Sequence, residues 1–88
     1  MNKLSVSEPQ LREYDGAGAI TAAKVVRTED GYVLVINVNW KEGDYTVYSQ
    51  RRKPRAWVSL DRLISHLLLI APTISNFQVF LHPEGNST

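Results

Sequence analysis

The sequence contains no cysteine, and its longest uninterrupted aliphatic run is only the five residues 67–71. Without cysteine there can be no disulfide framework, no thiolate nucleophile and no cysteine-based zinc or iron–sulfur site. A bilayer span needs about 20 consecutive apolar residues, and residues 1–10 lack the apolar run of a signal peptide. We therefore expect a cytoplasmic protein without a membrane segment, whose core is held by packing alone.

Signatures of catalysis and of cofactor binding are also missing. The stretch Gly16-Ala17-Gly18 lacks the second half of a dinucleotide fingerprint, and no Walker lysine is present. The only two histidines, His66 and His82, have no carboxylate at metal-ligand spacing on the same expected element. Glu29 and Asp30 fall in an expected turn, where Asp is favoured for backbone reasons. Because no nucleophile, base and oxyanion donor occur together, we expect no enzyme, no metal and no cofactor.

The 88 residues allow one small domain, and its clearest pattern runs from Tyr32 to Trp40. Apolar and polar side chains alternate there as in a half-buried strand. Turn signals flank it at Asp30-Gly31 and Glu42-Gly43. Turns of two residues at these positions predict an antiparallel meander over residues 20–28, 32–41 and 44–50, with Trp40 opposite Tyr45 and Val25 opposite Ile36.

This register sorts the meander into two faces. The inward face carries mainly apolar residues: Ala23, Val25, Leu34, Ile36, Val38, Trp40, Tyr45 and Val47. The outward face is largely polar: Lys24, Val26, Val33, Val35, Asn37, Asn39, Thr46, Tyr48, Gln50 and Arg52. A first turn of three residues would reverse the faces of the first strand, so the placement of Lys24 depends on that turn.

A helix follows, with Ser59 as the N-cap and Pro72 as the stop. Its apolar residues recur at helical spacing: Leu60, Leu63, Ile64, Leu67, Leu68 and Ala71. His66 lies opposite this stripe, which favours a solvated histidine over a ligand or general base. Alternation at residues 77–81 predicts a last strand, and residues 56–58 fit a short one.

These elements predict an α+β domain over residues 20–82, with the order β-β-β-(β)-α-β. The sheet would be antiparallel, with three to five strands, and one amphipathic helix would pack on one face. Residues 1–19 show no apolar periodicity and are expected to form a flexible arm, and residues 83–88 a disordered tail.

The basic residues are concentrated along the chain. The net charge is only +1, yet residues 41–62 carry +3. The run Arg51-Arg52-Lys53-Pro54-Arg55 suits phosphate contacts, and nearby aromatic rings suit base stacking. Amides on the outer face match base edges. The candidate nucleic-acid-binding residues are Arg51, Arg52, Lys53, Arg55, Trp57, Tyr48, Gln50, Asn37, Asn39 and Lys24.

Other interpretations fit the same residues. Short basic loops are common on solvated surfaces, and a polar outer face is typical of any half-buried sheet. Val26, Val33 and Val35 on the outer face would suit a protein partner better than DNA. Leu69, opposite the helix stripe, and an uncovered edge strand at residues 77–81 would suit a homodimer.

The segment from Gly43 to Leu68 combines a hairpin, the basic run, Trp57, Ser59-Leu60-Asp61 and a leucine-rich helix. It resembles small partition- or replication-related proteins of bacterial plasmids and integrative conjugative elements, over about a third of the chain. The resemblance rests on a pattern, not on a catalytic signature. It implies a mobile-element accessory protein that handles DNA.

More loosely, three strands followed by a helix are similar to the sheet-reading DNA-binding domains of plant transcription factors and integrase arms. That similarity implies DNA contacts from the exposed sheet face. A last strand at residues 77–81 and few basic residues on the first two strands depart from it. We expect a non-enzymatic protein that binds DNA through the basic loop and the adjacent sheet face, or alternatively a small inhibitor or regulator that uses this surface against a protein.

Overall fold

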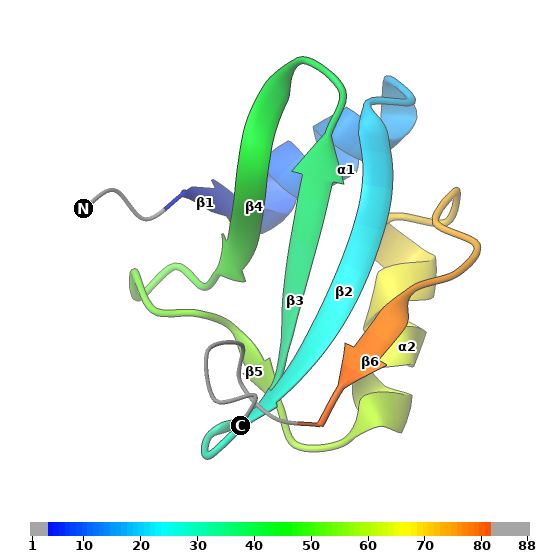
Figure 1. Ribbon diagram of the computed structural model, residues 1–88. Coiled ribbons are helices and arrows are strands. Elements are labelled where there is room, and N and C mark those ends of the chain that lie inside the picture. The colour runs from blue at the N-terminus through cyan, green and yellow to red at the C-terminus, as the bar shows by residue number, and fades with distance from the viewer. Residues whose placement is uncertain (1–3, 82–88) are drawn as a thin grey trace.

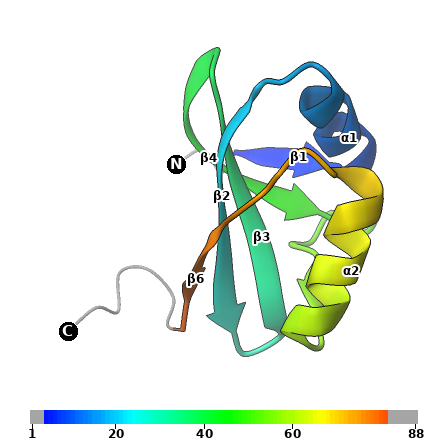
Figure 2. The same cartoon turned by 90° about the vertical axis from the view of Figure 1, so that its right-hand side faces the viewer.

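A sheet of six strands carries two helices on one face, and no helix of the described residues lies on the other face (Figures 1 and 2). The structure is a computed structural model and describes residues 4–81. The elements are β1 (Ser5–Ser7), α1 (Glu8–Gly16), β2 (Ile20–Thr28), β3 (Gly31–Val38), β4 (Lys41–Tyr48), β5 (Ala56–Trp57), α2 (Leu60–Ile70) and β6 (Gln78–Phe80). The fold is therefore α+β, as the pattern predicts. The expected tail at residues 83–88 lies outside the described residues.

The sheet is mixed, so the expectation of a purely antiparallel sheet is wrong. Its order is β1-β4-β3-β2-β6, with β5 paired to β3. The meander β2-β3-β4 is antiparallel, but β1 runs parallel to β4 and β6 parallel to β2. Each helix connects two strands of the same direction, β1 to β2 and β5 to β6. A helical crossover returns the chain to the same end of the sheet, which makes the next strand parallel.

The N-terminal region forms β1 and α1 instead of the expected flexible arm. Ser7 caps α1: its hydroxyl accepts from the Gln10 backbone N–H at 3.2 Å, and the Gln10 side-chain oxygen accepts from the Ser7 N–H at 2.9 Å. Pro9 suits the first turn, where a backbone N–H has no helical partner. Leu11 is fully buried, while Tyr14 is only partly so. With so few apolar residues α1 shows no periodic stripe, although its capping box is legible in the sequence.

The β2–β3 hairpin keeps the predicted faces although its register differs by two residues. Val25 pairs with Leu34 rather than with Ile36. An even shift leaves each side chain on the same face of the sheet, so Lys24 points outward as expected. Gly31 has φ +131°, and a Cβ there would collide with the Trp57 backbone carbonyl. Glycine at this position therefore lets β5 approach β3.

The β3–β4 hairpin turns earlier than the glycine signal predicts. Val38 pairs with Lys41, so the residues between them form the turn and the expected pair of Trp40 with Tyr45 is wrong. Trp40 is 56% exposed, and its ring meets that of Tyr14 edge-on with centroids 5.6 Å apart. The predicted inward position of Trp40 is thus replaced by a contact with α1, which the periodicity does not reveal.

Gly43 lies within β4 rather than in the turn. Its φ is +119°, and a Cβ there would collide with the Leu4 side chain. The Asn37 amide donates to the Gly43 carbonyl oxygen at 2.8 Å and fastens this irregular part of the ladder. Asn39, expected on the outer face, lies in the turn and is exposed.

The core lies between the inner face of the sheet and the two helices. Ser59 caps α2 and accepts from the Arg62 N–H at 3.2 Å, and α2 ends just before Pro72, as predicted. The buried apolar residues of the core cluster come from both helices, five strands and the residue after α2: Val6, Leu11, Ala23, Val25, Leu34, Ile36, Val38, Tyr45, Val47, Trp57, Leu63, Leu67, Ile70 and Ala71. Each fully buried large side chain contributes about 1.5–3 kcal/mol. Within residues 4–81 no helix has the length and apolarity needed to cross a membrane.

Candidate nucleic-acid interface

The basic run forms an ordered loop between β4 and β5. The Ser49 N–H donates to the Lys53 carbonyl at 2.8 Å, and the Arg52 N–H donates to the Ser49 carbonyl at 3.0 Å. The Ser49 hydroxyl also accepts from the Arg51 N–H at 3.2 Å. These hydrogen bonds close the loop on itself, so its cations extend from a fixed backbone. Gln50 and Arg52, expected on the outer sheet face, lie in this loop because β4 ends before them.

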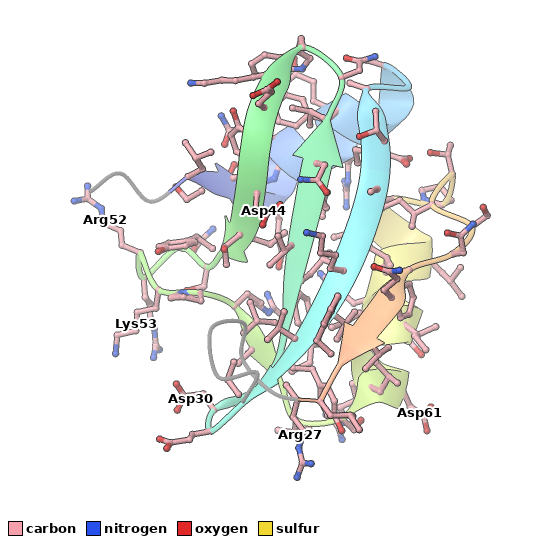
Figure 3. The ribbon with its side chains drawn as sticks, viewed as in Figure 1. Arg27, Asp30, Asp44, Arg52, Lys53 and Asp61 are labelled. Carbon is pink, nitrogen blue, oxygen red and sulfur yellow. The ribbon has the colours of Figure 1, made fainter. Side chains whose placement is uncertain are left out.

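Three cations of this loop have no acidic partner. Arg51, Arg52 and Lys53 are exposed, and none of them forms an ion pair within residues 4–81. Arg52 has φ +63°, a left-handed conformation that costs a non-glycine residue about 1 kcal/mol or more. Figure 3 shows Arg52 and Lys53 extending from the loop away from the sheet. The loop therefore offers three cations to an external anion.

A cleft of about 610 Å³ separates this loop from the start of α1. It brings together four of the candidate residues, Tyr48, Gln50, Arg51 and Arg55. Arg12 of α1 lines the same cleft, and the sequence pattern does not single it out. The capping box could have indicated Arg12, because it predicts a helix that begins at Glu8. In such a helix Glu8 and Arg12 are four residues apart and lie on the same side.

Arg55 differs from the other cations of the run because it is already paired. Its Nη1 lies 2.6 Å from Glu8 Oε2, and its guanidinium carbon lies 5.0 Å from the centroid of the Trp57 ring. The other Glu8 oxygen, Oε1, lies 3.1 Å from His66 Nε2. Glu8 therefore joins α1, the loop end and α2. His66 is half-buried in this cluster rather than simply solvated.

The structure places Trp57 in the core, away from any external base. The side chain is 7% exposed, and its ring centroid lies 5.8 Å from that of His66 on α2. Its indole nitrogen is buried without a hydrogen-bond partner among the described residues. Trp57 thus supports Arg55 from within, while Tyr48 is half-buried and lines the cleft beside the loop cation Arg51.

Two further candidates, Lys24 and Asn37, are engaged with Asp44 on the outer sheet face. Asn37 Nδ2 donates to Asp44 Oδ1 at 2.7 Å, and Lys24 Nζ lies 3.2 Å from the same oxygen. The hydrogen bond from Asn37 is the largest cause that holds the pKa of Asp44 below its usual range. Burial opposes it as the second-largest effect, and the hydrogen bond and charge of Lys24 each lower the pKa by less. Both donors already have an acceptor in this position.

The candidate residues therefore do not lie together: Lys24 and Asn37 lie on the outer face, and Trp57 lies in the core. The loop and cleft hold one group at the lower end of β4, whereas Asn39 lies in the β3–β4 turn at the opposite end (Figure 1). In Figure 3, Asp44 lies over the sheet, well apart from Arg52 and Lys53. Lys53 nevertheless borders the outer face, because it lines a cleft of about 570 Å³ together with Val35 and Thr46.

Within the described part of the chain, no group of His, Asp and Glu side chains could hold a metal ion. Comparisons of the chain with protein-family models, with curated proteins and with solved structures find no match. The described side chains combine an ordered cationic loop with a cleft lined by arginines and a tyrosine.

Proposed function

We propose that this protein binds DNA through the loop of residues 49–55 and the adjoining cleft, without catalysis. The observation that carries the proposal is the display of Arg51, Arg52 and Lys53 on a hydrogen-bonded loop with no acidic partner in residues 4–81. Exposed cations of this kind suit the phosphate backbone, which supplies most of non-specific affinity for DNA.

Arg12 takes the place that the sequence pattern gives to Arg55. It is exposed and lines the cleft, whereas Arg55 is held by Glu8. Four phosphate contacts, from Arg12 and the three loop cations, give a slope of about −3.6 for log K against log salt. Affinity would then fall roughly a hundredfold between about 50 and 200 mM salt. Tyr48 could add stacking on an unpaired base.

The experiment compares two triple charge reversals in fluorescence anisotropy with a labelled mixed-sequence duplex at about 50 mM salt. The loop variant replaces Arg51, Arg52 and Lys53 with Glu, and it should lose nearly all measurable affinity. The control replaces three exposed cations outside the loop and cleft by the same charge change: Arg27, Lys41 and Arg62. It should weaken binding far less. Equal losses in both variants, or no binding by the natural chain, would sink the proposal.

The resemblance to plasmid and conjugative-element proteins supports a setting in DNA partition or replication. We propose that setting for this protein. It would make the protein an accessory factor whose modest, salt-sensitive affinity is supplemented by other components at the DNA.

A second function is favoured by the sheet face opposite the two helices. Val26, Val35 and Phe80 line a cleft of about 190 Å³ there, and Phe80 is 40% exposed. Apolar side chains of this kind suit a protein partner. Val33, expected among them, is only 7% exposed because it pairs with Ala56 of β5. The test looks for a protein partner that co-purifies in equal amount. If this partner still co-purifies with the loop charge-reversal variant but not with Val35→Lys, the result favours this function over DNA binding.

A further inference from the structure

Glu8 occupies the position that a phosphate would take on Arg55. Glu8 Oε2 lies 2.6 Å from Arg55 Nη1, and the Glu8 side chain is only 25% exposed. A guanidinium recognises carboxylate and phosphate oxygens with the same donor geometry. Both side chains line the cleft beside the basic loop. An anion that reaches Arg55 from this cleft therefore meets a carboxylate already bound there.

Arg55 and Glu8 each have a second contact that does not depend on the other. The Arg55 guanidinium lies 5.0 Å from the centroid of the Trp57 ring, which packs in the core. Glu8 Oε1 lies 3.1 Å from His66 Nε2 on α2. When Arg55 turns to a phosphate, Trp57 still supports its guanidinium and His66 still binds the Glu8 carboxylate. Neither group is left without a partner, so exchange of the anion is structurally feasible.

We infer that Glu8 is a built-in competitor for the DNA phosphate, which keeps Arg55 out of the interface and limits the affinity of the cleft. This inference rests on the proposed function, since it describes how that site is regulated. By this inference the natural chain makes four phosphate contacts. A variant without the Glu8 charge makes five, because Arg55 becomes available. The salt slope would steepen from about −3.6 to about −4.5.

The test compares Glu8→Gln with Glu13→Gln. Both remove one negative charge from α1, but Glu13 is exposed and does not line the cleft. In anisotropy with the mixed duplex, Glu8→Gln should bind roughly threefold more tightly at low salt and show the steeper slope. Glu13→Gln should keep the natural slope. Adding Arg55→Ala to Glu8→Gln should abolish the gain. Thermal unfolding verifies that each variant is folded.

A second measurement separates this inference from DNA binding itself. Inorganic phosphate is titrated into isotope-labelled protein, and the side-chain Nε–H signal of Arg55 is followed by NMR. The Arg55 signal should shift at several-fold lower phosphate concentration in Glu8→Gln than in Glu13→Gln. If neither variant nor the natural chain binds DNA, the proposed function fails, whatever the phosphate result. If the two variants match in both slope and phosphate response, the competitor role of Glu8 is overturned.

Discussion

Asp15, at the end of α1, is buried to 4% exposure and accepts a hydrogen bond from the hydroxyl of Thr73, 58 residues further along the chain. The bond fastens the first helix to the segment between α2 and β6. A buried carboxylate needs such a donor, because an unpaired buried polar group costs more than a hydrogen bond returns. This pair links the N-terminal crossover to the C-terminal one.

Replacing Thr73 with Val should therefore destabilise the protein by about 1–3 kcal/mol, because the Asp15 carboxylate loses its donor. Thr21→Val on the exposed surface of β2 is the matched control and should change stability by less than about 0.5 kcal/mol. Urea unfolding measures both free energies. Equal effects of the two substitutions would contradict the role given to this pair.

Leu11→Ala should cost about 2–5 kcal/mol, because Leu11 is 0% exposed in the core. Leu69→Ala removes the same atoms from a side chain that is 78% exposed, and it should be nearly neutral. Thermal or urea unfolding distinguishes them. Were Leu11→Ala as mild as Leu69→Ala, the first residues would be an arm after all.

The Asp44 cluster predicts a weak dependence of stability on acid pH. The pKa of Asp44 is lowered in the folded state, first by the Asn37 hydrogen bond, so its contribution is present above the ordinary aspartate pKa of about 3.9. That contribution is lost as the pH falls through the lowered pKa. Asp44→Asn should thus be less stable than the natural chain at pH about 6, by less than about 1 kcal/mol, and the difference should vanish in stronger acid.

Urea unfolding between about pH 2.5 and 6 tests this dependence. Asn37→Ala removes the largest cause of the lowered pKa and should flatten the pH profile. A constant difference between Asp44→Asn and the natural chain over the whole range would contradict the account.

Substitutions of Arg52 should affect the stability of the fold and the affinity for DNA differently. Its φ of +63° penalises a side chain, so Arg52→Gly should leave stability unchanged or raise it by up to about 1 kcal/mol. Arg52→Val, with a β-branched side chain at the same φ, should destabilise. Both remove one phosphate contact and should reduce the salt slope by about 0.9. Identical stabilities for the two variants would show that the loop does not hold this conformation.

The meander and α2 could be predicted from the sequence because each has a strong periodic pattern. The predicted assignment of side chains to the two sheet faces is correct although the predicted register is wrong. Val25 pairs with Leu34 instead of Ile36, and a shift of two residues keeps each side chain on its face. Alternation at residues 77–81 also predicts the last strand, β6, but not its parallel pairing with β2. The first strand, β1, could not be predicted in this way, because its three residues carry too little alternation. The crossover that makes β1 parallel to β2 depends on α1, and the sequence indicates α1 by a capping box at Ser7 rather than by an apolar stripe.

Among the candidate site residues, the exposed cations Arg51, Arg52 and Lys53 follow from the run of basic residues in the sequence. The sequence pattern does not show which side chains from distant segments pair with one another. Arg55 is held by Glu8, 47 residues away, and Lys24 by Asp44, 20 residues away. Burial of Trp57 likewise depends on α2 packing over it. Sequence periodicity gives the face of a residue, whereas its availability to a ligand depends on these long-range contacts.

The salt dependence of DNA binding tests the central claim most directly. For the natural chain, log K against log salt should be linear with a slope of about −3.6. The variant Arg51→Gln, Arg52→Gly, Lys53→Gln should retain only the contact from Arg12, with a slope of about −0.9. A slope that is the same in both proteins, or a natural chain without affinity for DNA at about 50 mM salt, would contradict binding through this loop.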